Sequence, residues 1–216
     1  MEKSGATTNQ ISLDMRMDKK EIEQLEQRYR TTLINSLAGF RQAVLIGTRS
    51  VDDKNNLAIF NSLIHLGAHP ALYGFISRPD SVQRDTLQNI TDTKEYTFNF
   101  LPAKYYKKAH QTSARYAKGI SEFEKVGLTP AYQSGFKAPF VEEAVVKIAM
   151  QLEERIPITI NGTLLIVGSI IQVEMPDEIV DNDGFVNLSA SEVLISQGLD
   201  AYFVSRELGR LPYAKP

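Results

Sequence analysis

The stretch ITINGTLLIVGSIIQVEM, residues 158–175, decides the fold that we expect. Asn161-Gly162 lies between β-branched and aliphatic residues, and this dipeptide is a strong hairpin signal because both positions of a tight turn require positive φ. The run after the turn is apolar on both faces, which suits a central, curved strand, and Gly168 within it marks a bend. The stretch therefore predicts an antiparallel hairpin at the centre of a sheet.

Other segments on both sides of this hairpin have strand-like patterns. The clearest covers residues 95–101, where Tyr96, Phe98 and Phe100 point one way and Thr97 and Asn99 the other. Further strands are predicted over residues 31–37, 43–50, 57–64 and 71–77. Since strands outnumber helices and no strand–helix–strand rhythm repeats, we predict an antiparallel barrel decorated with helices.

Helices are expected around this barrel at residues 19–30, 81–93, 103–117 and 122–126. Asp18 with Glu21, and Ser121 with Glu124, have the spacing of capping boxes, and Gly127 is a typical helix stop. Residues 130–140 are predicted to form a loop. Residues 141–156 fit either a helix or a strand, and residues 185–216 are expected to hold a short helix or turn before a polar end.

Composition restricts the function more than it restricts the fold. The 216 residues include 24 Lys and Arg, 26 Asp and Glu, and no Cys, so the net charge is 24 − 26 = −2. This balance argues against electrostatic binding of nucleic acid by the domain as a whole. The absence of Cys excludes disulfides, thiolate metal sites and a Cys nucleophile. No run of 18 apolar residues and no secretory signal occur, so a cytoplasmic location away from membranes is expected.

Familiar catalytic motifs are missing from the sequence. His65 and His69 have the spacing of two metal ligands on a helix, but Gly67 and Pro70 oppose a helix there and no third ligand is evident. The sequence also contains no Gly-x-Ser-x-Gly elbow, no Walker loop and no Gly-x-Gly-x-x-Gly fingerprint. Hydrolytic and nucleoside-triphosphate chemistry therefore has no support, and no metal site is predicted.

Hydrogen-bond donors recur in three neighbouring segments instead. These segments are Asn61-Ser62 after one strand, Ser77-Arg78 at the end of another, and Arg84-Asp85-Thr86 at the start of a helix. Guanidinium groups and the free N–H groups of a helix N-terminus both favour phosphate. Each segment also has a plain reading, with Asp85 as an N-cap, Arg84 solvated, Asn61 and Ser62 on a half-exposed strand, and Arg78 in a loop.

At this point the sequence resembles a known family. The ordered segments Asn56–Ser62, Arg84–Ile90, Glu95–Asn99, Ala109–Ser113, Gly119–Phe123 and Ile166–Ile171 are similar to those of the flavin reductase-like FMN-binding split-barrel family, which includes flavoredoxins. The resemblance covers roughly residues 31–205, between a tail and helix at 1–30 and a tail at 206–216. Ile59 replaces the usual Pro, Asn61 replaces a common Ser, and residues 197–202 match the family's ending only loosely.

The resemblance implies a six-stranded split barrel that forms a homodimer and binds FMN. Asn61 and Ser62 would then lie along the ribityl chain and ring edge, and Asp85 would orient an arginine or cap the helix. The phosphate would be held by Ser77, Arg78, Arg84 and Thr86. The flavin ring would be approached by Thr112 and Ser113, with His110 and Tyr202 as further candidates.

Three functions follow from this resemblance. The first is an enzyme that passes reducing equivalents from NAD(P)H through FMN to a flavin or another acceptor. The second is a flavoredoxin-like FMN electron carrier that is reduced by a protein partner and has no nicotinamide site. The third is a barrel with an interaction role whose FMN site has decayed. A bound flavin supplies the redox chemistry in the first two, which explains why neither Cys nor a metal would be needed.

Overall fold

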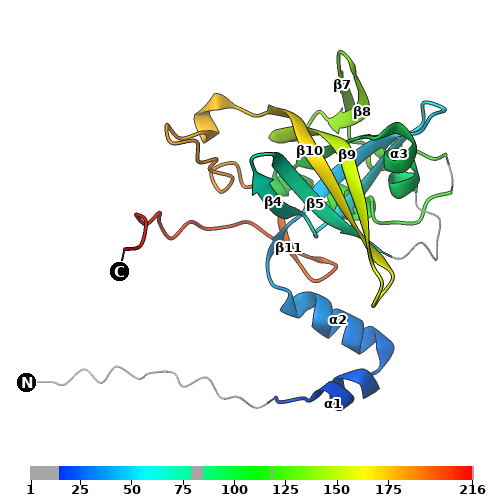
Figure 1. The fold of residues 1–216 in the computed structure, drawn as a ribbon, viewed down its shortest axis with the longest axis vertical. Helices are drawn as coiled ribbons and strands as arrows, with labels where there is room; N and C mark the ends of the chain where they lie inside the picture. Colours follow the sequence, from blue (N-terminus) through cyan, green and yellow to red (C-terminus); the bar gives the residue numbers. More distant parts are fainter. Residues whose placement is uncertain (1–14, 79–84, 118, 216) are drawn as a thin grey trace, which may run out of the picture.

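The computed structural model describes residues 15–78, 85–117 and 119–215. Its centre is an antiparallel sheet with the strand order β3-β2-β6-β9-β10-β5-β4, which curls into a barrel (Figure 1). The strands are β2 Val44–Arg49, β3 Asn55–Phe60, β4 Ile64–Ala68, β5 Ala71–Ser77, β6 Glu95–Phe100, β9 Val146–Ile158 and β10 Thr163–Glu174. The antiparallel barrel is confirmed, and the short β4 makes the sheet seven-stranded instead of six-stranded.

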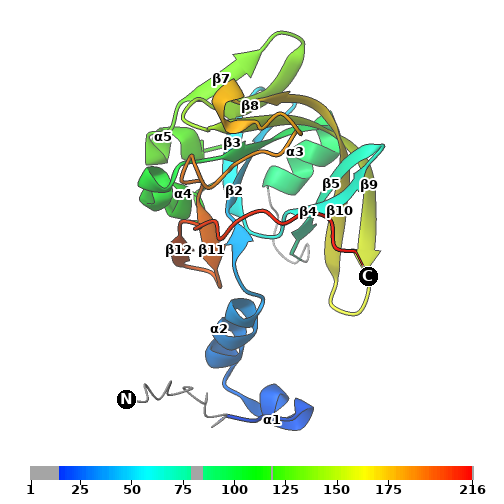
Figure 2. The same cartoon turned by 90° about the vertical axis from the view of Figure 1, so that its left-hand side faces the viewer.

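Five α-helices and two smaller sheets surround the barrel in the described residues (Figure 2). The helices are α1 Lys19–Gln24, α2 Gln27–Leu37, α3 Asp85–Thr93, α4 Tyr106–Gln111 and α5 Glu122–Val126, with 3-10 turns η1 Ala103–Tyr105 and η2 Asp177–Ile179. The smaller sheets pair β1 Arg41–Gln42, β11 Ile195–Gln197 and β12 Ala201–Phe203, and β7 Pro130–Gln133 with β8 Phe136–Val141. The β11–β12 hairpin is an element that the sequence analysis missed.

The predicted central hairpin is formed by β9 and β10, which pair from Thr163 opposite Ile158. The predicted two-residue turn was wrong, because four residues connect the strands and among them only Gly162 has positive φ, at +71°. The Asn161 carboxamide instead accepts hydrogen bonds from the N–H and hydroxyl of Thr163, at 3.1 and 2.8 Å. The Asn161 side chain thus stabilises the turn. A two-residue hairpin would instead have required positive φ at both turn positions.

The bend predicted at Gly168 is confirmed by a shift of register between Val167 and Gly168. A Cβ at this position would overlap the Tyr96 hydroxyl, which lies inside the barrel and has no hydrogen-bond partner among the described residues. Burial raises the pKa of Tyr96, so the phenol stays protonated. Gly168 therefore permits both the bend of β10 and the close approach of an aromatic side chain.

Two segments have a different secondary structure from the one predicted. Residues 31–37 are the second half of α2, where Thr31, Asn35 and Ser36 bond to backbone carbonyls of the preceding turn, so local hydrogen bonds outweigh β-branched propensity. Residues 130–140, predicted as a loop, form most of β7 and β8. Pro130 begins a strand of this two-stranded ribbon, a position that tolerates proline. Residues 141–156, which fitted either a helix or a strand, contain most of the strand β9.

Helix α3 closes one end of the barrel. Leu87 and Ile90 enter the apolar interior with Phe75, Phe98 and Ile166. Beside them runs a polar network of buried side chains. Asn56 donates to Thr48 at 3.1 Å and to Thr86 at 2.9 Å, and Asn89 donates to Thr48 at 3.1 Å. This network fixes α3 across β2 and β3, so the position of its N-terminus is defined by the barrel.

Helices α1 and α2 form an arm that extends away from the barrel (Figures 1 and 2). The capping box predicted at the start of α1 is present, with reciprocal bonds between Asp18 and Glu21. The one predicted for α5 is absent, since Ser121 occupies the N-cap position without a side-chain bond, although Gly127 ends that helix in the left-handed conformation. No residue of α1 or α2 is buried, so the arm makes little contact with its own barrel.

Candidate functional site

The ends of β3 and β5 meet where the barrel is split. The Ser62 hydroxyl donates to the carbonyl of Ile76 at 3.2 Å and accepts from its N–H at 3.1 Å. Ser77 is buried beside this point, and among the described residues its hydroxyl makes one long contact, of 3.4 Å, with the carbonyl of Arg78. The Arg78 side chain is exposed and forms no ion pair with any described residue. Two of the three predicted donor segments are therefore brought together, although the Ser62 hydroxyl is already used.

Asn61, His110 and Tyr202 are joined by the β11–β12 hairpin. Asn61 donates to the carbonyl of Gly198 at 2.8 Å, and Nδ1 of His110 lies 2.9 Å from the hydroxyl of Tyr202. Burial, and then the charge of Asp200, raise the pKa of Tyr202. The hairpin thus connects Asn61, at the end of β3, with His110 of α4, which is far from it in the sequence.

Thr86 lies at the other end of β3, because it is bonded to Asn56. Asn56 and Asn61 are five residues apart, which is about 17 Å along an extended strand. The Thr86 hydroxyl accepts from Asn56 and keeps its own proton for donation. Arg84 lies outside the described residues, so the third segment is represented only by Asp85 and Thr86. The predicted residues therefore extend along β3 rather than surrounding one point.

Thr112 and Ser113 are bonded within their own segment. Thr112 is buried and donates to the carbonyl of Ala109 at 2.8 Å, and Ser113 donates to that of His110 at 2.7 Å. Both hydroxyls therefore satisfy carbonyls at the C-terminal end of α4. They thus end the helix that carries His110, and their approach to the flavin ring stays a prediction.

Glu122 is a residue that the sequence analysis missed. Its carboxylate accepts a hydrogen bond of 2.9 Å from the N–H of Leu57, on the side of β3 that does not pair with β2. Burial, and to a lesser degree the nearby charge of Asp85, raise the pKa of Glu122, although the bond from Leu57 opposes this. The Ser-Glu-Phe-Glu pattern had been attributed to capping, and no local signal shows that a carboxylate reaches a strand 65 residues away.

The substitution Glu122→Gln is expected to stabilise the protein progressively, relative to the wild type, as the pH rises from 4.5 to 7. Folding favours the protonated form of Glu122, so the wild type loses this contribution as the pH rises through the raised pKa, whereas glutamine does not titrate. Urea unfolding at several pH values measures the difference. Glu122→Ala is the control, because it deprives Leu57 of its acceptor and should cost about 1–2 kcal/mol at low pH as well. Parallel pH profiles for wild type and Glu122→Gln would contradict this assignment.

Arg41 and Ser196 are two further polar residues beside the hairpin. They lie opposite each other on β1 and β11, and Tyr202 is the next cross-strand neighbour of Ser196. Nε of Arg41 and the hydroxyl of Ser196 are buried and have no hydrogen-bond partner among the described residues. Side chains opposite each other in a sheet share a face, so both lie on the side that carries Tyr202. They could not be predicted without the β11–β12 hairpin.

Other kinds of site find no support in the described ranges. No group of three or more His, Cys, Asp or Glu side chains there could hold a metal ion. Within the same ranges, every helix is too short or too polar to span a bilayer.

Comparison with known proteins gives one consistent result. The sequence model described as "Flavin reductase like domain" matches residues 37–189. A proposed flavin reductase with a split barrel domain from Shewanella frigidimarina NCIMB 400 is 47% identical in sequence. The match covers 93% of this chain and 100% of that one, with a TM-score of 0.89.

More distant structures share the fold at 18% identity. Nitrilotriacetate monooxygenase component B from Bacillus cereus has a TM-score of 0.80, over 91% of this chain and 98% of its own. Flavoredoxin of Desulfovibrio vulgaris (Miyazaki F) has a TM-score of 0.68, over 81% and 92%. With a family match over most of the length and a close structural relative, this split-barrel chain belongs to the flavin reductase-like domain family.

Proposed function

We propose that the protein binds FMN along the split of its barrel and oxidises NAD(P)H with it, passing the electrons to a flavin or another acceptor. The observation that carries this proposal is the meeting of β3 and β5 through Ser62 and Ile76. This contact sets Asn61 beside Ser77 and Arg78, at one end of an open strand edge, in a chain of the flavin reductase-like family.

The residues present fit such a cofactor. In the described structure, Ser77 offers a buried hydroxyl with one long contact, and Arg78 is a neighbouring cation without an ion pair. Thr86 offers a hydroxyl proton in the first turn of α3, and the N-terminal end of a helix favours an anion through its dipole and backbone N–H groups. Ser77 and Arg78 would hold the phosphate at their end of β3, and Thr86 and Asp85, which lie at its other end, stay predicted members of the phosphate site. Arg84 remains a predicted member of the set.

The unpaired edge of β3 suits the polar rim of a flavin ring. Since the N–H of Leu57 points away from β2, alternation of the strand directs that of Ile59 the same way. Asn61 lies on this side, and the His110–Tyr202 pair stands next to it. The FMN would supply hydride and electron transfer. The residues of the chain would orient the ring, exclude water from one face and provide neutral donors.

The second candidate is the electron carrier without a nicotinamide site. The structural similarity to a flavoredoxin favours it, as does the lack of a dinucleotide fingerprint in the sequence. Anaerobic titration separates the two. Bleaching of the bound flavin by NADH or NADPH supports the enzyme, whereas bleaching by dithionite alone supports the carrier. A purified protein that shows no flavin absorbance after FMN is added would refute both.

The substitution Arg78→Ala is expected to weaken FMN binding about tenfold or more, since a charge-assisted bond to a phosphate contributes about 1.5–3 kcal/mol. Quenching of flavin fluorescence on binding measures the affinity. Arg155→Ala is the matched control, because Arg155 is an exposed arginine on β9 without an ion pair in the described structure. Equal affinities for Arg78→Ala and the control would remove Arg78 from the site.

We also propose that the protein is a homodimer in which α2 packs on a second copy. Tyr29, Leu33 and Leu37 follow one another at the four-residue spacing of a single helix face, and Ile34 flanks them. Tyr29, Ile34 and Leu37 are 50%, 46% and 72% exposed. An amphipathic helix normally turns its apolar face to the protein, but α2 turns this face away from its own barrel.

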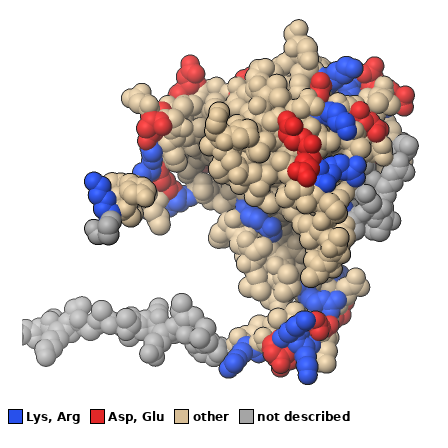
Figure 3. Space-filling view, in the orientation of Figure 1, with Lys and Arg blue, Asp and Glu red and all other residues tan. Residues whose placement is uncertain are grey.

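The second copy is the occupant that the surroundings of α2 favour. An eleven-residue helix with no buried residue has little stability by itself, so its apolar face requires a partner. Residues 1–14, which precede the described part, contain too few large apolar side chains to cover it. The segment that joins α2 to the barrel, and the adjoining face of β4 and β5, carry few charged side chains (Figure 3). Ile64 and Leu66 of β4 are 38% and 41% exposed there. The cytoplasmic location stays a prediction.

A further inference from the structure

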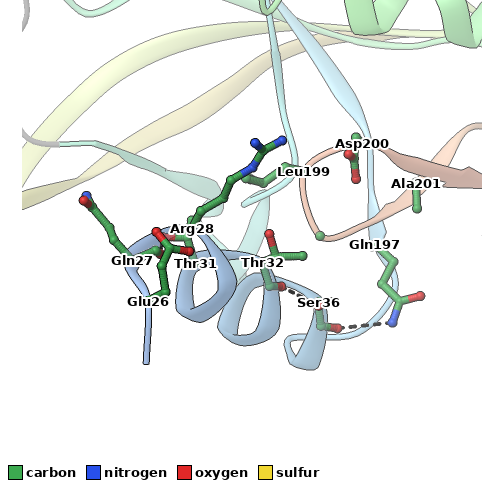
Figure 4. Close-up of a pocket in the computed structure, with 11 residues that line it drawn as sticks. Glu26, Gln27, Arg28, Thr31, Thr32, Ser36, Gln197, Leu199, Asp200 and Ala201 are labelled. Carbon is green, nitrogen blue, oxygen red and sulfur yellow. Dashed lines mark hydrogen bonds between the residues drawn. The ribbon is translucent and has the colours of Figure 1, made fainter. Parts of the chain in front are cut away.

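A groove of about 620 Å³ lies between α2 and the turn that joins β11 to β12 (Figure 4). Its two walls are held in place by one bond, from the Gln197 carboxamide to the carbonyl of Ser36 at 3.2 Å. The helix wall is polar, since Arg28, Thr31 and Thr32 belong to the face of α2 opposite the apolar stripe. The polar wall of the groove and the apolar stripe therefore lie on opposite faces of α2.

Besides the Glu26 carboxylate and several neutral polar side chains, the lining holds three groups that indicate a ligand. Arg28 extends from α2 toward Leu199 and Asp200 of the turn (Figure 4), and it forms no ion pair within the described residues. Asp200 adds an exposed carboxylate, and Leu199, which is 43% exposed, adds an apolar surface. A guanidinium suits a pyrophosphate, a carboxylate suits the vicinal hydroxyls of a ribose, and an aliphatic side chain suits a planar base. A dinucleotide carries all three of these groups.

The groove also adjoins the candidate flavin site. Gly198, which lines it, accepts the hydrogen bond from Asn61, and Ala201, at its other end, directly precedes Tyr202. A ligand with phosphates at Arg28 would therefore have its far end next to Gly198 and its partner Asn61. This arrangement suits a dinucleotide substrate of a flavin enzyme, because the phosphates are bound away from the reaction while the other end of the ligand lies at the reacting group.

We infer that this groove is the binding site for the pyrophosphate and adenosine part of NAD(P)H, with Arg28 as the group that binds phosphate. The inference rests on the proposed function and adds the position of the substrate. It also gives the arm a second role, since the polar face of α2 binds substrate while the apolar face binds the second copy.

The test compares Arg28→Ala with wild type, using two reductants and one binding measurement. KM for NADH or NADPH should rise about tenfold or more with kcat little changed, which corresponds to the loss of a charge-assisted bond. Activity with N-benzyl-1,4-dihydronicotinamide, which has neither phosphate nor adenosine, should be unchanged. Calorimetric titration of the flavin-free protein with NAD⁺ or NADP⁺ should show the same loss of affinity, and FMN affinity should be unaltered.

Lys20→Ala is the matched control, because it removes one exposed positive charge from α1, outside the groove. Arg28→Lys should restore part of the affinity. If wild type oxidises NAD(P)H and Arg28→Ala does so with the same KM, the groove is not the site, although the proposed function stands. If the variant also loses activity with the benzyl compound or loses FMN, Arg28 has a structural role and the inference is wrong. If wild type is reduced by no nicotinamide compound, the proposed function itself fails.

Discussion

Replacing Gly47 with alanine is expected to lower the free energy of unfolding by about 3 kcal/mol, the upper range for overpacking a core. A Cβ at Gly47 would overlap the carbonyl oxygen of Pro139 and lie 2.6 Å from Oγ1 of Thr97. Neither atom can withdraw easily. Thr97 donates to that same carbonyl at 2.7 Å and accepts from Asn99 at 2.8 Å, so moving it disrupts a buried network.

Chemical denaturation measures this effect, with Gly67→Ala as the control. A Cβ at Gly67 would meet only the carbonyl of Pro70, at 3.2 Å, on the edge strand β4. Its cost should stay below about 1 kcal/mol, as for most surface substitutions. A loss of stability at Gly47 no larger than that at Gly67 would show that β8 can move away from β2, and that its close packing is not required for the fold.

The substitution Leu37→Asp is expected to convert the dimer into a monomer. Leu37 is 72% exposed in the single chain, so the change should leave its folding intact. In the proposed dimer it would bury an unpaired carboxylate at each of two symmetry-related positions, and each costs about 3 kcal/mol, roughly 100-fold in the dissociation constant. Light scattering after size exclusion should give a mass near the 24.2 kDa of one chain instead of twice that value.

The control for this prediction is Gln24→Asp, which places the same charge on an exposed position of α1. It should leave the dimer intact. Two results would contradict the proposed interface. One is a wild type that runs as a monomer at micromolar concentration, and the other is a Leu37→Asp variant that remains a dimer with an unchanged dissociation constant.

The fold was predictable from the sequence where the periodicity was strong. The alternation in β6 and the two-sided apolar run of β10 correctly indicated buried strands, and Gly168 correctly marked a bend. Prediction failed where a residue type is compatible with two kinds of secondary structure. The threonines of residues 31–37 suggested a strand but bond within a helix, and the prolines of residues 130–140 suggested a loop but lie in a β-ribbon.

The candidate site was predictable only as a set of residues, without their arrangement. The order of the motifs indicated Asn61, Ser77 and Arg78, and the structure brings them together at the split. Ser62 is bonded to the backbone of β5, and its contact with the cofactor stays a prediction. Glu122 and Arg28 were missed because their importance depends on contacts with Leu57 and with the β11–β12 turn, which are distant in the sequence.

The bond pair between Ser62 and Ile76 also affects how a cofactor could enter and leave. Neighbouring strands of the sheet are joined by hydrogen-bond ladders, whereas among the described residues the end of β3 is joined to β5 by these two bonds and by the packing of Phe60 on Phe75. Separating the two segments there costs about 1–3 kcal/mol, far less than unfolding the domain. Exchange of a long, planar molecule would then be governed by the opening of this seam, and the residence time of the cofactor would depend on a single serine.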